Sequence, residues 1–356
     1  MRAFKGFIAA VFVLAVIAGV GYGVLTVKRA ADARSLENVV VEPAPPQPVE
    51  AEEPVPTDPR LEGLLARPDG ARLLWVPEKG ERPLAAGFID NGTLVVSATS
   101  TVGKDARWKI LRLDVASASA TVIFDATRPR KASSHRAAHR NAGTLCYASP
   151  DERGVSEIWC SGLDGKNERR LTTHDGAEDL VAPALSPDGV WAAFEVNDDR
   201  AKKPTGASIW KIGLNGANIQ QLTRGADDRG PTWSDDGSKL YFQRRLPNGS
   251  WDAYAMDADG KNAAPLLRTH DEDELSPVRR GASDLFIMAE GKMGEPTRIR
   301  SLDAVTKSGA YLTSGANGVE TSPSISPDGA LVSFLAPISP DEPDRVGVWL
   351  LQLDTP

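Results

Sequence analysis

Cysteine and histidine are scarce in this chain of 356 residues, which has two cysteines and four histidines. Two cysteines exclude a disulfide-dense scaffold and a zinc site with four thiolate ligands. Four histidines leave little material for histidine-based metal chemistry, so we expect no metal site and no cofactor. Excess basic charge is also missing, because the formal net charge is -7. We therefore expect no nucleic-acid partner, since nucleic-acid binding needs many phosphate-neutralising cations.

The common catalytic motifs are absent as well. The chain has no nucleophile elbow Gly-x-Ser-x-Gly, no phosphate loop, no His-Glu-x-x-His and no Cys-x-x-Cys. Each of these motifs places a nucleophile, a phosphate or a metal where its chemistry needs it. We therefore expect a binding module rather than an enzyme.

Long uncharged runs are missing except at the N-terminus. After a short flank at 1–6, residues 7–27 carry no charge, and Lys28 closes the run. At about 1.5 Å per residue this run reaches roughly 31 Å, the thickness of a hydrocarbon core. A cleaved signal peptide is the alternative, because Ala31-Asp32-Ala33 offers a cleavage site of small residues. The apolar region of a signal peptide is usually about 7–15 residues, so the sequence favours an uncleaved transmembrane anchor. Flanking basic residues are nearly even and do not set its orientation.

A linker is expected over residues 28–60. Its part from 42 to 59 holds seven prolines and five acidic residues, with no basic residue. Proline favours extended geometry and like charges repel, so this composition predicts a solvated, extended spacer. The remaining residues, 61–356, form the predicted folded domain.

The folded domain is an internal repeat of a turn followed by a short strand. The three best copies of the turn are Ser186-Pro187-Asp188-Gly189, Ser234-Asp235-Asp236-Gly237 and Ser326-Pro327-Asp328-Gly329. In such turns aspartate caps the backbone and glycine takes a left-handed position. The strands that follow align at Val96, Tyr147, Phe194, Phe242, Ile287 and Phe334.

A second strand recurs about fifteen residues later in each unit, and a third often follows. The second strand aligns at Leu111, Trp159, Trp210, Tyr254, Arg300 and Trp349. Several short strands in a period of 44–51 residues predict the blades of a β-propeller. Six units account for residues 88–356, so we predict an all-β, six-bladed β-propeller. The last unit lacks a closing strand, and residues 71–77 can supply it from the other end of the domain.

The repeat resembles that of TolB-type propellers. Ser-Pro-Asp-Gly-x-x-x-x-Phe, then Ile-Trp, then Gln-Leu-Thr carries the resemblance, and 186–223 shows it best. Propellers of this family are commonly extracytoplasmic in bacteria and bind partner proteins. The resemblance therefore implies a body outside the cytoplasm, in the periplasm, that works by propeller-mediated binding. Residues 28–70 leave room only for a linker, so the separate N-terminal domain of TolB is not expected here.

Acidic residues recur between the last strand of one unit and the first strand of the next. They are Asp175, Glu178, Asp179, Asp227, Asp228, Asp271, Glu272, Asp273, Glu274 and Glu320. Equivalent repeat positions return to the same face of a ring, so we expect these acids to gather around the channel. Such a face would attract a basic peptide segment, and it leaves room for a channel-bound cation. A solvated acidic rim without a ligand is the alternative.

Three further features of the repeat stand out. Cys146 and Cys160 lie on neighbouring strands of one unit, so a cross-strand disulfide is feasible, with two buried thiols as the alternative. A stretch from Arg128 to Arg140 is basic, and we interpret it as a solvated loop. Tryptophans at one repeat position, such as Trp210, should pack between blades.

The sequence thus favours a single-pass membrane protein with a monomeric propeller that binds an envelope protein. The alternatives are a channel-mouth enzyme of the polysaccharide lyase or hydrolase type, and a sensor of a ligand or ion. We expect reversal of Asp227, Asp228, Asp271 and Asp273 to lysine to weaken partner binding without unfolding the ring.

Overall fold

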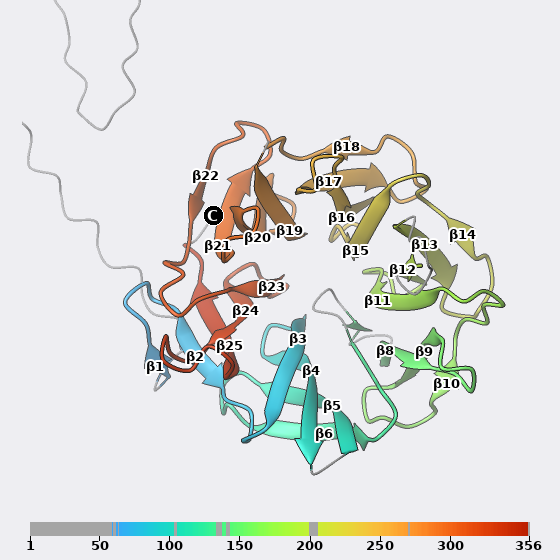
Figure 1. Ribbon diagram of the computed structural model, residues 1–356, viewed down its shortest axis with the longest axis horizontal. Coiled ribbons are helices and arrows are strands. Elements are labelled where there is room, and N and C mark those ends of the chain that lie inside the picture. The colour runs from blue at the N-terminus through green and yellow to red at the C-terminus, as the bar shows by residue number, and fades with distance from the viewer. Residues whose placement is uncertain are drawn as a thin grey trace, which may run out of the picture. The chain divides into compact units, whose positions relative to one another are not determined.

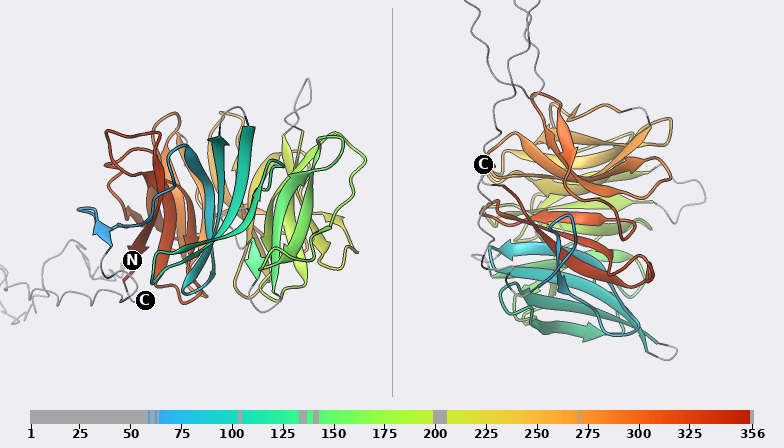
Figure 2. Two further views of the ribbon diagram at one scale, coloured as in Figure 1. Left: turned by 90° about the horizontal axis from the view of Figure 1, so that it is seen from below. Right: turned by 90° about the vertical axis from the view of Figure 1, so that its left-hand side faces the viewer.

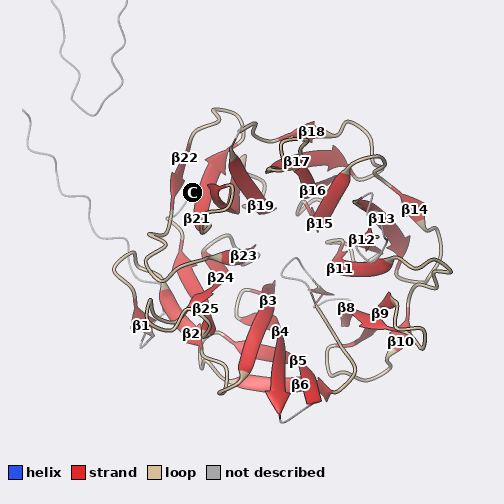
Figure 3. Cartoon of the chain, in the orientation of Figure 1, coloured by secondary structure: helices blue, strands red, loops and turns tan. Residues whose placement is uncertain are grey.

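The described part of the chain is a ring of six antiparallel β-sheets. The computed structural model describes residues 59, 62, 64–102, 105–132, 137–139, 143–198, 206–269 and 271–354. These residues form strands and turns and contain no α-helix (Figure 1, Figure 3). The predicted six-bladed, all-β propeller is therefore confirmed.

The six blades follow one another in chain order. Blade 1 consists of β3 (Glu81–Asp90), β4 (Thr93–Val102), β5 (Asp105–Asp114) and β6 (Ala120–Ala126). Blade 2 consists of β7 (Ala138–His139), β8 (Thr144–Pro150), β9 (Ser156–Gly162) and β10 (Arg169–Arg170). Blade 3 consists of β11 (Asp179–Leu185), β12 (Trp191–Asn197), β13 (Ala207–Gly213) and β14 (Gln220–Gln221). Blade 4 consists of β15 (Asp227–Trp233), β16 (Lys239–Arg245), β17 (Trp251–Asp257) and β18 (Ala264–Pro265). Blade 5 consists of β19 (Glu272–Arg279), β20 (Leu285–Lys292), β21 (Arg298–Asp303) and β22 (Gly309–Tyr311).

Blade 6 is built from both ends of the domain. It takes β23 (Thr321–Ile325), β24 (Leu331–Pro337) and β25 (Val346–Gln352) from the C-terminal end. It takes β1 (Leu65–Ala66) and β2 (Arg72–Trp75) from the N-terminal end, and β2 pairs antiparallel with β25. The strand predicted to close the ring is therefore confirmed.

Seen from the side in Figure 2, the strands run from one face of the ring to the other. We call one face the turn face, because it carries the Ser-x-Asp-Gly turns at 186–189, 234–237 and 326–329. There Gly189, Gly237 and Gly329 have φ near +70°, as the motif predicts. We call the other the crossover face, because there the chain crosses from one blade into the first strand of the next.

Six apolar clusters hold neighbouring blades together, one at each junction. The junction of blades 3 and 4, for example, buries Ala193, Trp233 and Phe242. The junction between blades 6 and 1 closes the ring with Leu94, Leu331 and similar residues. Burial of apolar surface between sheets is what a repeat unit cannot achieve alone, so the ring is stable only when complete.

The alignment of the repeats is confirmed in five blades and is wrong by one residue in blade 5. Phe242 faces Tyr254 across β16 and β17, and Phe334 faces Trp349 in blade 6. In blade 5 the residue facing Arg300 is Met288, not Ile287. Both side chains are fully buried, so an apolar pattern alone could not choose between them.

The predicted anchor at 7–27 and most of the linker at 28–60 lie outside the described residues. Among the residues that are described, none belongs to a helix long and apolar enough to cross a membrane. The anchor and the boundary at residue 61 stay predictions.

Candidate functional site

All ten acidic residues singled out in the sequence lie where the chain enters the first strands of blades 3 to 6, on the crossover face. Their surroundings divide them into three groups. Three aspartates bind backbone of the preceding blade, three acids are fully buried, and four are exposed or half-buried.

Three latch aspartates, Asp179, Asp227 and Asp273, join each blade to the one before it. Each begins or nearly begins an innermost strand. Each accepts a hydrogen bond from the first N–H of the third strand in the preceding blade. The distances are 2.7 Å to Ser156 N, 2.9 Å to Ala207 N and 3.0 Å to Trp251 N. A carboxylate that accepts backbone N–H bonds is a strong, charge-assisted acceptor, so the latch aspartates serve the ring itself.

Asp228 and Glu274 occupy one repeated cross-strand pair, which we call the crossover rung. Its first residue lies three positions before a proline in each of β11, β15 and β19. The rung is Leu180–Val196 in blade 3, Asp228–Arg244 in blade 4 and Glu274–Glu290 in blade 5.

The two acidic rungs are both buried but differ in charge. The Asp228 carboxylate is fully buried and takes two hydrogen bonds from the Arg244 guanidinium, at 2.6 and 2.9 Å. Within the described ranges, no arginine or lysine side chain forms a hydrogen bond with Glu274. Its carboxylate accepts hydrogen bonds from Ala253 N, at 3.0 Å, and from the Thr269 hydroxyl, at 3.1 Å. Burial raises the pKa of Glu274 to about 7, and the nearby Asp252 carboxylate adds to this effect.

Glu320, at the start of blade 6, is also fully buried. It accepts hydrogen bonds from Arg67 Nη2, at 2.7 Å, and from Ile299 N, at 3.2 Å. The Arg67 guanidinium also lies 5.1 Å from the centre of the Trp349 ring. Arg67 lies between β1 and β2, so Glu320 ties the closing hairpin to blades 5 and 6.

Asp175, Glu178, Asp271 and Glu272 form the remaining group, which we call the outer acids. Asp175 and Asp271 are exposed, and Glu178 and Glu272 are half-buried. The Nε2 atom of His174 lies 2.9 Å from a Glu178 oxygen, and this hydrogen bond lowers the pKa of Glu178. The outer acids are the part of the predicted acidic surface that a macromolecule could reach.

This division corrects the expected effect of the charge reversal. Of the four residues chosen for it, only Asp271 is exposed. Lysine at Asp228 would bury a second cation beside Arg244, and lysine at Asp227 or Asp273 would remove a latch. The ring would lose stability, so this reversal cannot test partner binding alone. Among the described residues, no group of three or more His, Cys, Asp or Glu side chains is arranged to hold a metal ion.

Cys146 and Cys160 face each other across β8 and β9, and their sulfur atoms are bonded. Both residues are buried in the cluster between blades 2 and 3. The disulfide joins residues that are 14 positions apart in the sequence, and in general such a link restricts the conformations of the unfolded chain.

The basic stretch between blades 1 and 2 is not a solvated loop over its described residues. The Arg128 guanidinium lies 4.1 Å from the centre of the Trp159 ring, and Arg130 lies 4.7 Å from that of Phe124. Lys131 exchanges two backbone hydrogen bonds with Ala148. Cations stacked on aromatic rings are attracted to the negative ring faces, so this stretch packs the two blades together.

Sequence reasoning missed a recess on the turn face, between blades 3 and 4. Trp191, Trp233 and Lys211 line it, beside two of the Ser-Pro-Asp-Gly-type turns. The available signal was the pair of tryptophans that flank the two turns, five residues after Ser186 and one before Ser234.

Solved structures share this architecture at low identity. A TolB candidate from Agrobacterium tumefaciens is 16% identical with a TM-score of 0.56, over 80% of this chain and 94% of that one. TolB from Acinetobacter baumannii is 17% identical with a TM-score of 0.52, over 70% of this chain and 60% of that one. A gluconolactonase from Xanthomonas campestris is 16% identical with a TM-score of 0.55, over 80% of this chain and 89% of that one. No curated protein matches the chain.

The gluconolactonase corrects one expectation. From the missing motifs we expected that the protein is not an enzyme, and that exclusion is wrong. A solved structure of the same fold is a gluconolactonase, so the fold does not argue against an enzyme. At these identities the likeness shows the fold and nothing of the chemistry.

The assignment of the chain to a family rests on a separate finding. The family model of the TolB beta propeller domain matches residues 95–343, which is well over half of the chain. The match covers the three turns and the strands from β5 to β24. The chain therefore belongs to the TolB β-propeller family.

Proposed function

We propose that this protein is a membrane-tethered propeller outside the cytoplasm that binds a partner protein of the cell envelope through its outer acids. The observation that carries the proposal is the division of the acidic residues. Six of them hold the ring together, whereas Asp175, Glu178, Asp271 and Glu272 face solvent at least in part. Exposed carboxylates on two blades of one face suit a partner with a basic segment, because complementary charge steers association.

The disulfide supports the proposed location. Disulfides persist in oxidising compartments such as the periplasm and are rare in the cytosol. The apolar run at 7–27 supports a tether, and the acidic, proline-rich linker supports a spacer that lets the ring reach a partner.

Crosslinking in cells, followed by affinity capture of the full chain, tests the proposal. The test variant is Asp175→Lys/Asp271→Lys, which reverses the two exposed outer acids. The control is Asp164→Lys/Asp259→Lys, which makes the same change in net charge on turns of the turn face. We expect the test variant to lose its main crosslinked protein by about tenfold, because electrostatic complementarity contributes to both rate and affinity. The control should retain it.

Two results would overturn the proposal. One is an equal yield of the crosslinked protein from both variants and the unaltered chain. The other is an equal loss from both variants, which would indicate net charge rather than a surface. Thermal unfolding of each variant shows that the ring is intact.

A further inference from the structure

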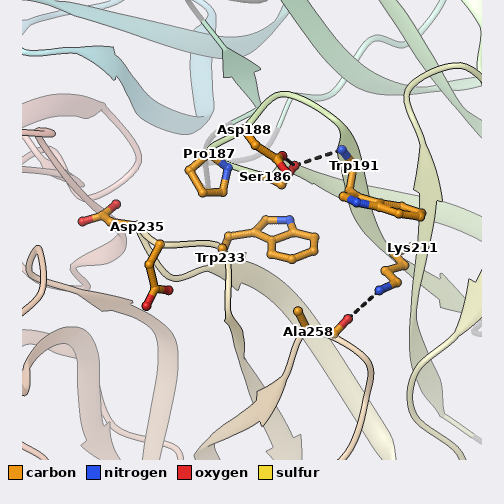
Figure 4. Close-up of a pocket in the computed structure, with 10 residues that line it drawn as sticks. Ser186, Pro187, Asp188, Trp191, Lys211, Trp233, Asp235 and Ala258 are labelled. Carbon is orange, nitrogen blue, oxygen red and sulfur yellow. Dashed lines mark hydrogen bonds between the residues drawn. The ribbon is translucent and has the colours of Figure 1, made fainter.

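The recess between blades 3 and 4 has the size of a small-molecule site. Its volume is about 360 Å³, and ligand pockets are commonly about 300–1,000 Å³. Figure 4 shows Trp233 in the middle, Trp191 and Lys211 at one side, and the turn with Pro187 and Asp188 above. Asp235 and Asp236 of the next turn complete the opposite side.

Lys211 supplies hydrogen-bond donors to the recess. Its Nζ atom donates one hydrogen bond to the Ala258 carbonyl, at 2.7 Å, and lies 4.8 Å from the centre of the Trp191 ring. An ammonium group has three N–H donors, so two remain for a ligand. Burial lowers the pKa of Lys211, because few charges compensate for the water it has lost.

Asp188 and Asp236 supply acceptors. One oxygen of each carboxylate is used within its own turn, by Val190 N at 3.0 Å and by Ser238 N at 2.9 Å. The second oxygen of each makes no hydrogen bond within the turn. Hydrogen bonds from Ser234 and Ser238 lower the pKa of Asp236 to about 2, so this acceptor stays charged at physiological pH.

Flat apolar surface completes the recess. Trp233 is nearly buried, and its indole N–H already donates to the Ala184 carbonyl at 3.0 Å. What it offers to the recess is therefore carbon surface. Trp191 and Pro187 add further ring surface that is half-buried.

We propose that this recess binds a neutral sugar. A sugar ring carries hydroxyl groups that both donate and accept, and a C–H face that packs on aromatic rings. The recess matches each of these features. An anionic ligand would meet the carboxylates of Asp188, Asp235 and Asp236, and a cationic ligand would meet the ammonium group of Lys211. The carboxylates thus disfavour an anion, and the ammonium group of Lys211 disfavours a cation in the part of the recess beside Trp191.

The site lies on the turn face, away from the outer acids, so it does not depend on the proposed partner binding. The full chain is titrated with glucose, galactose, N-acetylglucosamine and their β-linked disaccharides, with calorimetry and tryptophan fluorescence as readouts. Glucuronic acid and glucosamine serve as the charged counterparts. We expect at least one neutral sugar to bind with a Kd of about 1 mM or tighter.

Variants locate the binding. Lys211→Met keeps the apolar stem of the side chain and removes its donors, and it should weaken binding about tenfold. Asp188→Asn is a second variant with the same expected direction, in case Lys211→Met perturbs the ring. Lys166→Met is the matched control, because Lys166 is an exposed lysine on the corresponding face of blade 2. The control should bind as the unaltered chain does.

Three results would overturn the proposal. The first is no binding of any neutral sugar at concentrations of about 50 mM. The second is tighter binding of glucuronic acid or glucosamine than of the neutral sugars. The third is unchanged binding by folded Lys211→Met and Asp188→Asn variants, which would place the sugar elsewhere.

Discussion

Blade 3 and blade 4 have the same register but fill the crossover rung differently. Blade 3 pairs Leu180 with Val196, and blade 4 pairs Asp228 with Arg244. Both first strands have a bulge at the same place, two residues after the rung and just before a proline. The residue before that proline has a positive φ in both, +51° at Ala182 and +61° at Gly230.

The comparison separates what holds the fold from what is free to vary. The features that set the path of the backbone repeat between the blades. They are the latch aspartate, the bulge and the proline. The rung side chains do not repeat, since blade 5 uses two carboxylates, Glu274 and Glu290, at the same place. The chemistry of the crossover face can therefore change from blade to blade while the backbone stays the same.

The largest expected effect comes from breaking the charged rung of blade 4. Asp228→Ala should lower the free energy of unfolding by about 3–5 kcal/mol, because it leaves the Arg244 charge half-buried without its partner. Asp228→Leu/Arg244→Val, which copies blade 3, should recover most of this loss, since apolar pairs often replace buried ion pairs at little cost. Urea unfolding measures both variants. A double variant as unstable as Asp228→Ala would show that the two blades are not interchangeable.

The carboxylate rung of blade 5 should make stability depend on pH. Glu274 lies near the carboxylates of Asp252 and Glu290, while Arg300 approaches Glu290. The pKa of Glu274 is about 7 when folded, against an ordinary value of 4.5. The protonated form is favoured in the folded ring, so its contribution is fully present below pH 4.5 and is lost as pH rises through 7.

Glu274→Gln isolates this contribution, because glutamine does not titrate. Relative to that variant, the unaltered chain should lose up to about 3 kcal/mol of stability between pH 4.5 and about pH 7. Urea unfolding at a series of pH values measures the difference. Parallel curves for the two proteins would contradict the assigned pKa.

The smallest expected effect concerns the bulge. Gly230→Ala should lower stability by about 0.5–1 kcal/mol, because alanine prefers a negative φ. A Cβ atom at Gly230 would have room, with its nearest neighbour 4.0 Å away at Gln243 Oε1, so the cost is one of backbone conformation. Ala182→Gly in blade 3 should change stability by less, since the gain in the fold is offset by the freer unfolded chain. Urea unfolding measures both variants. Changes in unfolding free energy of equal size and opposite sign at the two sites would contradict the smaller effect expected for Ala182→Gly.

Repetition explains which features could be predicted from the sequence. The six blades and the closing strand followed from buried residues such as Phe194 and Phe334, because a junction cluster needs an apolar residue once per blade. The predicted alignment of the repeat in blade 5 was wrong by one residue, because the neighbouring residues Ile287 and Met288 are both buried. When both faces of a sheet are covered, an apolar sequence pattern locates a buried strand more surely than it sets the register of that strand.

Partners from other blades explain what could not be predicted. The sequence placed the acidic residues at the start of each blade, but nothing near Asp227 indicates that Ala207 N–H is its partner. In the same way, nothing near Arg128 indicates the ring of Trp159. The sugar recess needs two turns from different blades, and only the closed ring brings them together.

The pairing of β2 with β25 has a consequence for the order of events during synthesis. Arg72 of β2 and Leu350 of β25 are partners in one sheet, so β2 is made early but can pair only after the last strand has been made. Until β25 is made, Leu74 lacks the part of its apolar cluster that Val348 and Leu350 supply. Contacts between distant segments slow folding and prolong exposure of apolar surface. The growing chain therefore passes most of its synthesis as an open arc, and its period of greatest risk of aggregation ends only with the final strand.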